Sequence, residues 1–298
     1  MDYRVLGTSS LNVSVIGFGC MSLKQSEKES IQLLQQAVNT GINFFDTADL
    51  YDKGDNEQVV GKALKEKRSQ LVIATKVGNQ WREDGSGWDW NPRKEYILKA
   101  VEKSLKRLQT DYIDLYQLHG GTIEDPIEET IEAFELLKTQ GKILHYGISS
   151  IRPNVIREYI HRSHITSVLM QYSLLDRRPE EECISLITQN KIGLLSRGAL
   201  AQGLLAGKPA KDYLQLSKEK VKEIATLVNS LSNKNRSPAQ TAIRFVLQQP
   251  GMSSAIIGIR TREQLDEVVQ TLKTPELTTE ELNQLKEIAP AGKYDQHR

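Results

Sequence analysis

The sequence predicts a closed barrel of eight parallel strands, each followed by a helix, which is the α/β architecture known as the (β/α)8 or TIM barrel. Eight short runs rich in Val, Ile and Leu alternate with segments of helical periodicity along the 298 residues. Near-continuous apolar runs are typical of strands that helices cover. Strict alternation favours parallel pairing through right-handed crossovers, and eight repeats favour a barrel over the alternative, an open doubly wound sheet. The runs cover residues 16–20, 44–46, 71–76, 113–118, 143–149, 168–172, 192–197 and 254–257.

The chain starts with a predicted β-hairpin, residues 3–7 and 12–16, and the repeats follow. Ser26 precedes the first helix and Glu29 stands three positions later, which is the spacing of a capping box. Gly41 and Gly141 stand where helices are expected to stop. Proline fits the first turn of a helix, and the prolines that mark predicted starts are Pro92, Pro126, Pro153, Pro179 and Pro238.

Two connections are longer than a compact barrel needs, residues 78–91 and 198–217. Both follow strands at the end of the barrel where active sites lie, so we expect lids or binding loops there. The first connection carries Trp81, Trp88 and Trp90, which suggests an aromatic wall.

The last third of the chain contains more helices than the repeat requires. Two helical patterns, 217–231 and 238–249, precede the eighth strand, so one of them is additional. Another, 278–288, follows the last repeat, and residues 290–298 are expected to form a loose tail. No linker composition interrupts the chain, so we expect residues 1–298 to form a single domain.

Composition excludes several classes of partner. With 39 basic and 38 acidic residues the chain offers no broad field for nucleic acid or an anionic membrane. No apolar run approaches the ~20 residues of a membrane span, and no signal-peptide pattern opens the chain. Together with only two cysteines, Cys20 and Cys183, these features predict a cytoplasmic protein with reduced thiols. The oligomeric state is not predicted, although a monomer is slightly favoured.

Four polar residues stand at or just past the ends of three consecutive predicted strands: Asp46, Tyr51, Lys76 and His119. The carboxyl ends of parallel neighbouring strands meet at one rim, so we expect these side chains to converge. A carboxylate, a phenol, an amine and an imidazole together can deliver a proton to a carbonyl oxygen.

The expected division of work follows from pKa values. Tyr51 is the natural general acid, but a free phenol has a pKa of about 10, too high for good proton transfer at neutral pH. We expect the Lys76 ammonium to lower that pKa by up to ~3 units. Asp46 keeps Lys76 charged, and a neutral His119 orients and polarises the carbonyl.

Other chemistries are weaker alternatives. Lys76 could form a Schiff base as in an aldolase, but Tyr51 and Asp46 would then have no role. Cys20 could be a reactive thiol, although a small residue in a tight turn is the favoured interpretation. No metal site is expected, because His119 is the only histidine at a strand end. No G-x-S-x-G motif indicates a serine nucleophile.

A proton donor facing a carbonyl needs a source of hydride, which a cofactor must supply. The first strand leads into GFGCMS and lacks the G-x-G-x-x-G of a Rossmann site. The segment IIGIRTREQLDEVV, residues 256–269, runs from the eighth strand into a helix whose first turn can bind phosphate. Arg260 and Arg262 add forked donors for a ribose phosphate, which favours NADPH over NADH.

Three stretches together resemble the aldo-keto reductase superfamily: DTADLY with Glu57 and Gly61, LKRLQTDYIDLYQLHG, and GKILHYGISS. The similarity is greatest to bacterial members that also resemble potassium-channel β subunits. It implies an NAD(P)H-dependent barrel reductase of small carbonyl compounds with Asp46, Tyr51, Lys76 and His119 as catalytic residues. The residues that the resemblance places against the cofactor are Cys20, Met21, Ser149, Gln171, Arg197, Gly198, Leu200, Gln202, Lys208, Gly258, Arg260, Arg262, Gln264 and Glu267.

Four residues depart from the pattern of that superfamily. Ser150 replaces a common Asn, Val268 replaces a frequent adenine-binding Asn, and Asp52 follows Tyr51 in place of Gly. Arg197 stands where many members stack an aromatic ring on the nicotinamide. The channel-subunit similarity leaves a nicotinamide-sensing binding module with little turnover as the alternative function, but all four catalytic positions are filled.

Overall fold

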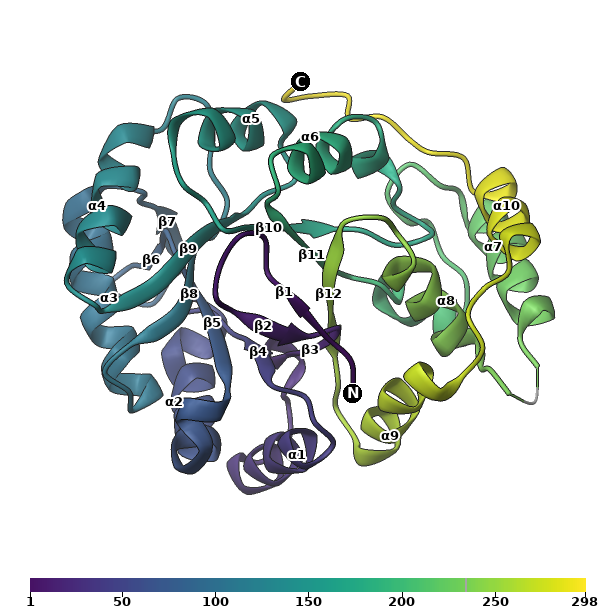
Figure 1. Ribbon diagram of the computed structural model, residues 1–298, viewed down its shortest axis with the longest axis horizontal. Helices are drawn as coiled ribbons and strands as arrows, with labels where there is room; N and C mark the ends of the chain where they lie inside the picture. Colours follow the sequence, from purple (N-terminus) through teal and green to yellow (C-terminus); the bar gives the residue numbers. More distant parts are fainter. Residues whose placement is uncertain (234) are drawn as a thin grey trace.

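The predicted barrel is confirmed by the computed structural model, which describes residues 1–233 and 235–298. Eight strands close in the order β10-β11-β12-β3-β4-β5-β8-β9, and every neighbouring pair is parallel. The helices surround this barrel (Figure 1). The strands are β3 (Ile16–Gly19), β4 (Phe44–Asp46), β5 (Val72–Val77), β8 (Ile113–Leu118), β9 (Ile143–Ser149), β10 (Ser167–Gln171), β11 (Gly193–Arg197) and β12 (Met252–Gly258).

The N-terminal hairpin, β1 (Tyr3–Val5) and β2 (Asn12–Ser14), covers one end of the barrel and lies across its centre in Figure 1. Leu6 in its turn packs against the backbone of Gly193 at the start of β11, and no side chain longer than hydrogen fits there. The hairpin therefore closes the amino-terminal end of the strands. Its apolar residues join the buried barrel interior in one cluster, which comprises Leu6, Leu11, Val13, Phe44, Val72, Ala74, Leu115, Leu169, Leu195 and Ile256.

Most predicted helix starts and stops match the structure. The Ser26–Glu29 capping box is formed, and Gly41 and Gly141 follow α1 and α4 with φ of 94° and 70°. Pro179 is an exception, because it opens only a short 3-10 turn (Arg178–Glu180), held by the Arg177–Glu180 ion pair. The helices are α1 (Glu27–Asn39), α2 (Asp55–Leu64), α3 (Lys94–Leu108), α4 (Ile127–Thr139), α5 (Pro153–Arg162), α6 (Cys183–Gln189), α7 (Lys218–Leu231), α8 (Pro238–Leu247), α9 (Arg262–Gln270) and α10 (Thr279–Ile288). Within the described ranges, none of them has the length and apolar character to cross a bilayer.

The first long connection is a second hairpin. Strands β6 (Asn79–Trp81) and β7 (Trp88–Trp90) pair antiparallel, with Trp81 opposite Trp88. This hairpin rises from the carboxyl end of β5, beside the rim that carries the candidate residues.

The expectation of a loose C-terminal tail is wrong. Tyr294 is 5% exposed, and its ring stacks under the guanidinium of Arg178. In Figure 1 the yellow segment after α10 runs past α6 toward α5, where the amide of Asn154 donates to the carbonyl of His297. The polar composition of residues 290–298 hides this packing, because its partners lie more than a hundred positions earlier in the chain.

Candidate active site

The last inward-facing residues of the strands form one ring at the carboxyl end of the barrel. Side chains alternate between the two faces of a strand, and Phe44, Ala74 and Leu115 face the interior. Two positions further along, the same face carries polar groups. In register, Lys76 lies opposite Gln117 and Gln171 lies opposite Arg197. The ring contains Gly19, Asp46, Lys76, Gln117, Ser149, Gln171, Arg197 and Gly258.

Asp46 and Lys76 form a buried ion pair within this ring. The Lys76 ammonium donates to a carboxylate oxygen of Asp46 at 2.6 Å and to the carbonyl of Thr47 at 2.7 Å. Burial alone would lower the pKa of Lys76, but the charges of Asp46 and Tyr51 raise it above its ordinary value. The ammonium is therefore held charged inside the protein, as the sequence predicted.

Tyr51 begins a short 3-10 turn after β4 and faces both Lys76 and His119. The Lys76 ammonium lies 5.2 Å from the centre of the phenol ring, and the His119 ring stands edge-on to it at 5.7 Å. Burial raises the pKa of Tyr51, and Asp46 adds to this rise, whereas Lys76 and Arg197 oppose it. The expectation that Lys76 brings this pKa below the ordinary value is wrong for the protein alone, because the burial of the phenol outweighs the neighbouring cation.

His119 is held by its own backbone at the end of β8. Its amide donates to the carbonyl of Val77 at 2.8 Å, and its carbonyl accepts from the side chain of Asn79. Burial, together with the charges of Lys76 and Arg197, lowers the pKa of His119 to about 3. The imidazole is consequently neutral at pH 7, as expected. Its buried Nδ1 has no hydrogen-bond partner among the described residues.

The hairpin β6–β7 forms a wall next to these groups. A side chain at Gly78 would place its Cβ 2.6 Å from the ring of Trp90, so the glycine lets the indole lie against the strand end. The Trp90 indole donates to Asp125, and the Trp81 indole donates to the carbonyl of Leu50, one residue before Tyr51.

Of two further buried polar groups, Gln117 was missed by the sequence analysis, and Glu57 was named only as part of the resemblance, without a role. Gln117 is fully buried, and its amide donates to the second carboxylate oxygen of Asp46 at 3.4 Å. Glu57 accepts from Thr75, Ser104 and Arg107, which joins α2 and α3 to β5. The signal for Gln117 was present, because it shares strand parity with His119 and faces Lys76.

On the opposite side of the ring, Arg197 donates to the amide oxygen of Gln171 at 3.0 Å. The Gln171 amide nitrogen donates in turn to Asp176 at 2.9 Å. Arg197 is exposed on the rim, yet its charge acts on Asp46, Tyr51 and His119. Ser149, half-buried at the end of β9, belongs to the same ring.

The two ends of the expected cofactor site meet beside β3 and β12. The hydroxyl of Ser22, next to Met21, donates to the carbonyls of Gly19 and Ile259. Met21 is 59% exposed, whereas Cys20 is buried with its pKa raised by that burial, which argues against a reactive thiol.

Helix α9 begins at Arg262, where the side chain of Thr261 caps the amide of Gln264. Arg260 and Gln264 are exposed, and the carboxylate of Glu267 instead accepts from Ser237. In the second long connection, Gly198 has a positive φ and Lys208 lies along Gly203. Gln202 accepts from Lys211, and Leu200 is half-buried at the start of that turn. Exposed guanidinium groups and a helix N-terminus suit the phosphates of a dinucleotide, so the residues present fit such a cofactor.

Comparison with known proteins agrees with this geometry. The model of the Aldo/keto reductase family matches residues 15–290. The chain belongs to the aldo/keto reductase family. The predicted family is thus confirmed, and with it an oxidoreductase of the general kind that acts on small carbonyl compounds.

Relatives of this aldo/keto reductase match over nearly their full length. It is 46% identical to the uncharacterized oxidoreductase YqkF of Bacillus subtilis, with all of both chains covered. It is 30% identical to the NADH-specific methylglyoxal reductase of Escherichia coli, with 96% of this chain and 98% of the relative covered. The holo form of aldo-keto reductase AKR11C1 from Bacillus halodurans is 48% identical, with 100% and 99% covered and a TM-score of 0.94.

Proposed function

We propose that this aldo/keto reductase transfers hydride from NADPH to an aldehyde or ketone, with Tyr51 as the general acid. The observation that carries the proposal is the convergence of Tyr51, His119 and the Asp46–Lys76 pair at the carboxyl end of the barrel. The reduced nicotinamide supplies the hydride when it is bound; the chain's own residues supply the proton and the geometry.

The proton comes from the phenol of Tyr51. Its raised pKa keeps the phenol protonated at neutral pH, so the donor is in the correct state before the reaction. Charge then develops on the phenolic oxygen as the carbonyl oxygen takes the proton. The Lys76 ammonium stabilises that charge. A cation ~4 Å away contributes up to ~4 kcal/mol at an effective dielectric of ~20. The role of Lys76 is therefore to stabilise the phenolate during transfer, and Asp46 keeps it charged for this purpose.

His119 positions the substrate. A neutral imidazole carries one N–H, which can donate to the carbonyl oxygen without competing for the proton that Tyr51 delivers. Its edge-on contact with the Tyr51 ring keeps the two groups side by side. The substrate then lies between these residues and the Trp81–Trp90 wall, which suits a small carbonyl compound.

The preference for the phosphorylated cofactor rests on Arg260 and Arg262. The Arg262 side chain is 64% exposed, and its ion pair with Asp266 is loose at 3.7 Å, so its guanidinium is available. One relative is named as NADH-specific, so the arginines rather than family membership support NADPH. Comparing kcat/KM for the two cofactors tests this directly: replacement of both arginines by alanine should bring the values together, and equal values in the wild type would overturn the preference.

Both cysteines are buried and unpaired, which supports the expected reducing, cytoplasmic location. For the oligomeric state, a monomer remains the slightly favoured expectation.

The decisive experiment is Tyr51→Phe, which removes one hydroxyl and keeps the ring. Turnover of an aldehyde panel should fall roughly 10²–10⁴-fold, while the Kd of NADPH stays within about twofold. Tyr3→Phe is the matched control, since this exposed hydroxyl donates to Gly41 at the other end of the barrel and should leave turnover unchanged. Full activity of Tyr51→Phe would overturn the mechanism. Tight NADPH binding by the wild type without turnover of any carbonyl would favour a sensing module instead.

A further inference from the structure

The C-terminal segment, residues 290–298, is tied to the rim of the barrel through Tyr294. Its ring lies 4.9 Å from the guanidinium carbon of Arg178, and both groups are largely buried. The Tyr294 amide donates to Glu181 at 3.3 Å, which fixes the backbone at the same point. Tyr294 thus anchors the segment through specific contacts with the residues that follow β10.

Arg178 contacts Tyr294 on one side and binds Asp176 on the other. Its Nε and Nη2 donate to the two carboxylate oxygens at 2.7 and 2.9 Å, a bidentate pair. The Asp176 side chain is 1% exposed, so the pair is shielded from water. Because the fork holds the carboxylate plane, Asp176 cannot turn without breaking both bonds.

Asp176 in turn decides which way the amide of Gln171 points. An ionised carboxylate only accepts hydrogen bonds, so the Gln171 nitrogen must face Asp176. A guanidinium only donates, so the amide oxygen must face Arg197. With one acceptor and one donor on its two sides, the amide has a single orientation. Its second N–H donates to the hydroxyl of Tyr213 at 3.4 Å, and the remaining lone pair of its oxygen is presented in a fixed direction.

We propose that Asp176, Arg178 and Tyr294 are positioning residues for the cofactor's carboxamide and act by fixing the amide of Gln171. The C-terminal segment accordingly supports the cofactor site indirectly, because Tyr294 contacts Arg178 and acts on Gln171 only through Arg178 and Asp176. This inference rests on the proposed function, in which Gln171 binds the nicotinamide carboxamide.

The test compares two ligands by calorimetry, and its readout is binding rather than turnover. NADPH carries the carboxamide, whereas 2′-phospho-ADP-ribose contains the adenosine end and lacks the nicotinamide. In Asp176→Asn the carboxylate becomes an amide, whose nitrogen can face the Gln171 nitrogen as a second donor in place of an acceptor. Tyr294→Ala removes the ring that packs on the guanidinium of Arg178. Each should weaken NADPH roughly 5–10-fold, about the worth of one hydrogen bond. Each should leave the Kd of 2′-phospho-ADP-ribose within about twofold.

Tyr294→Phe is the conservative control. The hydroxyl of Tyr294 is buried and has no partner among the described residues, while the ring that stacks on Arg178 is retained. This variant should bind both ligands like the wild type. Melting temperatures measured in parallel identify any variant that fails to fold, and the other then decides the question.

Gln171→Ala separates the two levels of the proposal. If it leaves the Kd of NADPH unchanged, the assignment of the carboxamide to Gln171 fails, and the proposed cofactor placement fails with it. If it weakens NADPH while Asp176→Asn and Tyr294→Ala bind like the wild type, the positioning role alone is overturned. Equal weakening of both ligands by those two variants would show a general structural role and would also overturn it.

Discussion

The Asp46 carboxylate and the Lys76 ammonium lie 2.6 Å apart, with side chains only 7% and 1% exposed. They come from the neighbouring strands β4 and β5, and Gln117 from β8 binds the second oxygen of Asp46. Three adjacent strands therefore enclose one charged pair, which makes the proposed catalytic rim and the stability of the barrel depend on the same contact.

Removal of one member of this pair should destabilise the protein strongly. Asp46→Asn leaves a buried ammonium without a counter-charge, and the expected loss is ~3–5 kcal/mol of the free energy of unfolding. Adding Lys76→Met should restore much of that loss, because no buried charge remains, but turnover should not return. Urea denaturation measures the free energy of unfolding of the single and the double variant. Glu95→Gln is the control, since the exposed pair of Glu95 with Lys99 should contribute almost nothing to stability; a similarly small loss for Asp46→Asn would contradict this account.

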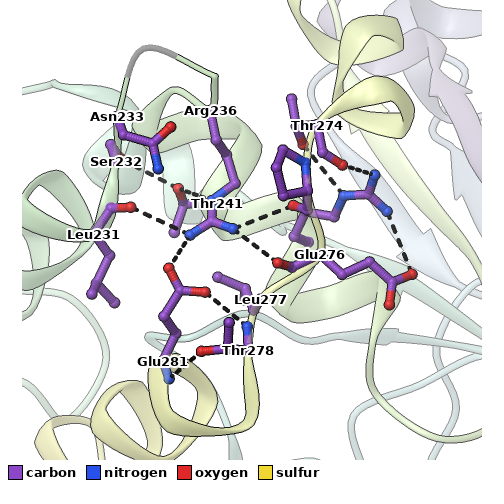
Figure 2. A network of polar contacts seen from close by, with 12 residues as sticks. Leu231, Ser232, Asn233, Arg236, Thr241, Thr274, Glu276, Leu277, Thr278 and Glu281 are labelled. Atoms are coloured by element: carbon purple, nitrogen blue, oxygen red, sulfur yellow. Dashed lines mark hydrogen bonds and ion pairs between the residues drawn. The ribbon is translucent and has the colours of Figure 1, made fainter.

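Arg236 is a second buried cation with a structural role. Figure 2 shows its guanidinium between the end of α7 and the start of α10. It donates to Thr241, to the carbonyls of Leu231, Pro275 and Glu276, and to the carboxylate of Glu281. Glu281 also completes the capping box of α10 with Thr278.

Arg236→Ala should therefore cost ~3 kcal/mol or more, because it leaves several buried acceptors and one carboxylate unpaired. Arg236→Lys keeps the charge but cannot reproduce the fork, so an intermediate loss is expected. The comparison is Arg93→Ala, whose side chain is 67% exposed and pairs with Glu129 at 3.4 Å; thermal melts should show almost no change. Equal melting temperatures for the Arg93 and Arg236 variants would refute the structural role.

The sequence predicted the barrel and the convergence of four residues because both depend on local pattern. Apolar runs mark strands, and residues at their carboxyl ends must share one rim. Gln117 was accessible to the same reasoning, since it has the parity of His119, but a polar residue inside an apolar run was overlooked.

Other features depend on three-dimensional burial, which no local pattern carries. The direction of the Tyr51 pKa follows from how much water the folded chain excludes around the phenol, and charge counting alone gave the opposite sign. Tyr294 is buried by Arg178, more than a hundred residues earlier, so its polar surroundings in the sequence indicated a loose end. The hairpin in residues 78–91 was hidden because two three-residue strands separated by Gly85 and Gly87 resemble a loop.

His119 should leave a clear mark on the pH profile of the reaction. With a pKa of about 3 it does not titrate between pH 5 and 8, so kcat/KM should show no inflection near the ordinary value of ~6.5 for histidine. A group whose folded pKa is depressed in this way destabilises the fold under acid, because the unfolded chain takes up the proton first. The contribution of His119 to stability should therefore fall by up to ~1.4 kcal/mol per pH unit below about 6.5, measured as the difference in the free energy of unfolding between the wild type and His119→Asn. A fall of kcat/KM below pH 6.5 that disappears in His119→Asn would contradict the assignment.

Asp49 should change the pH dependence of stability in the opposite sense to His119. It is 7% exposed, one carboxyl oxygen has no partner among the described residues, and burial followed by the charge of Glu57 raises its pKa from 3.8 to about 8. As pH rises above 4 the unfolded chain loses this proton while the folded protein keeps it. Stability therefore declines from pH 4 to about 8 and then levels.

Asp49→Asn removes this penalty, so its gain over the wild type should grow with pH and approach at most ~6 kcal/mol near pH 8.5, at ~1.4 kcal/mol per pKa unit. Between pH 4 and 6.5 the slopes of Asp49 and His119 nearly cancel in the wild type. The contribution of His119 is constant from pH 6.5 to 8, so in that interval the wild type should lose stability relative to Asp49→Asn. Urea unfolding at a series of pH values measures this, with the exposed Asp111→Asn as the control. A constant difference between Asp49→Asn and the wild type at every pH would show that folding does not shift the pKa of this carboxyl and would contradict the prediction.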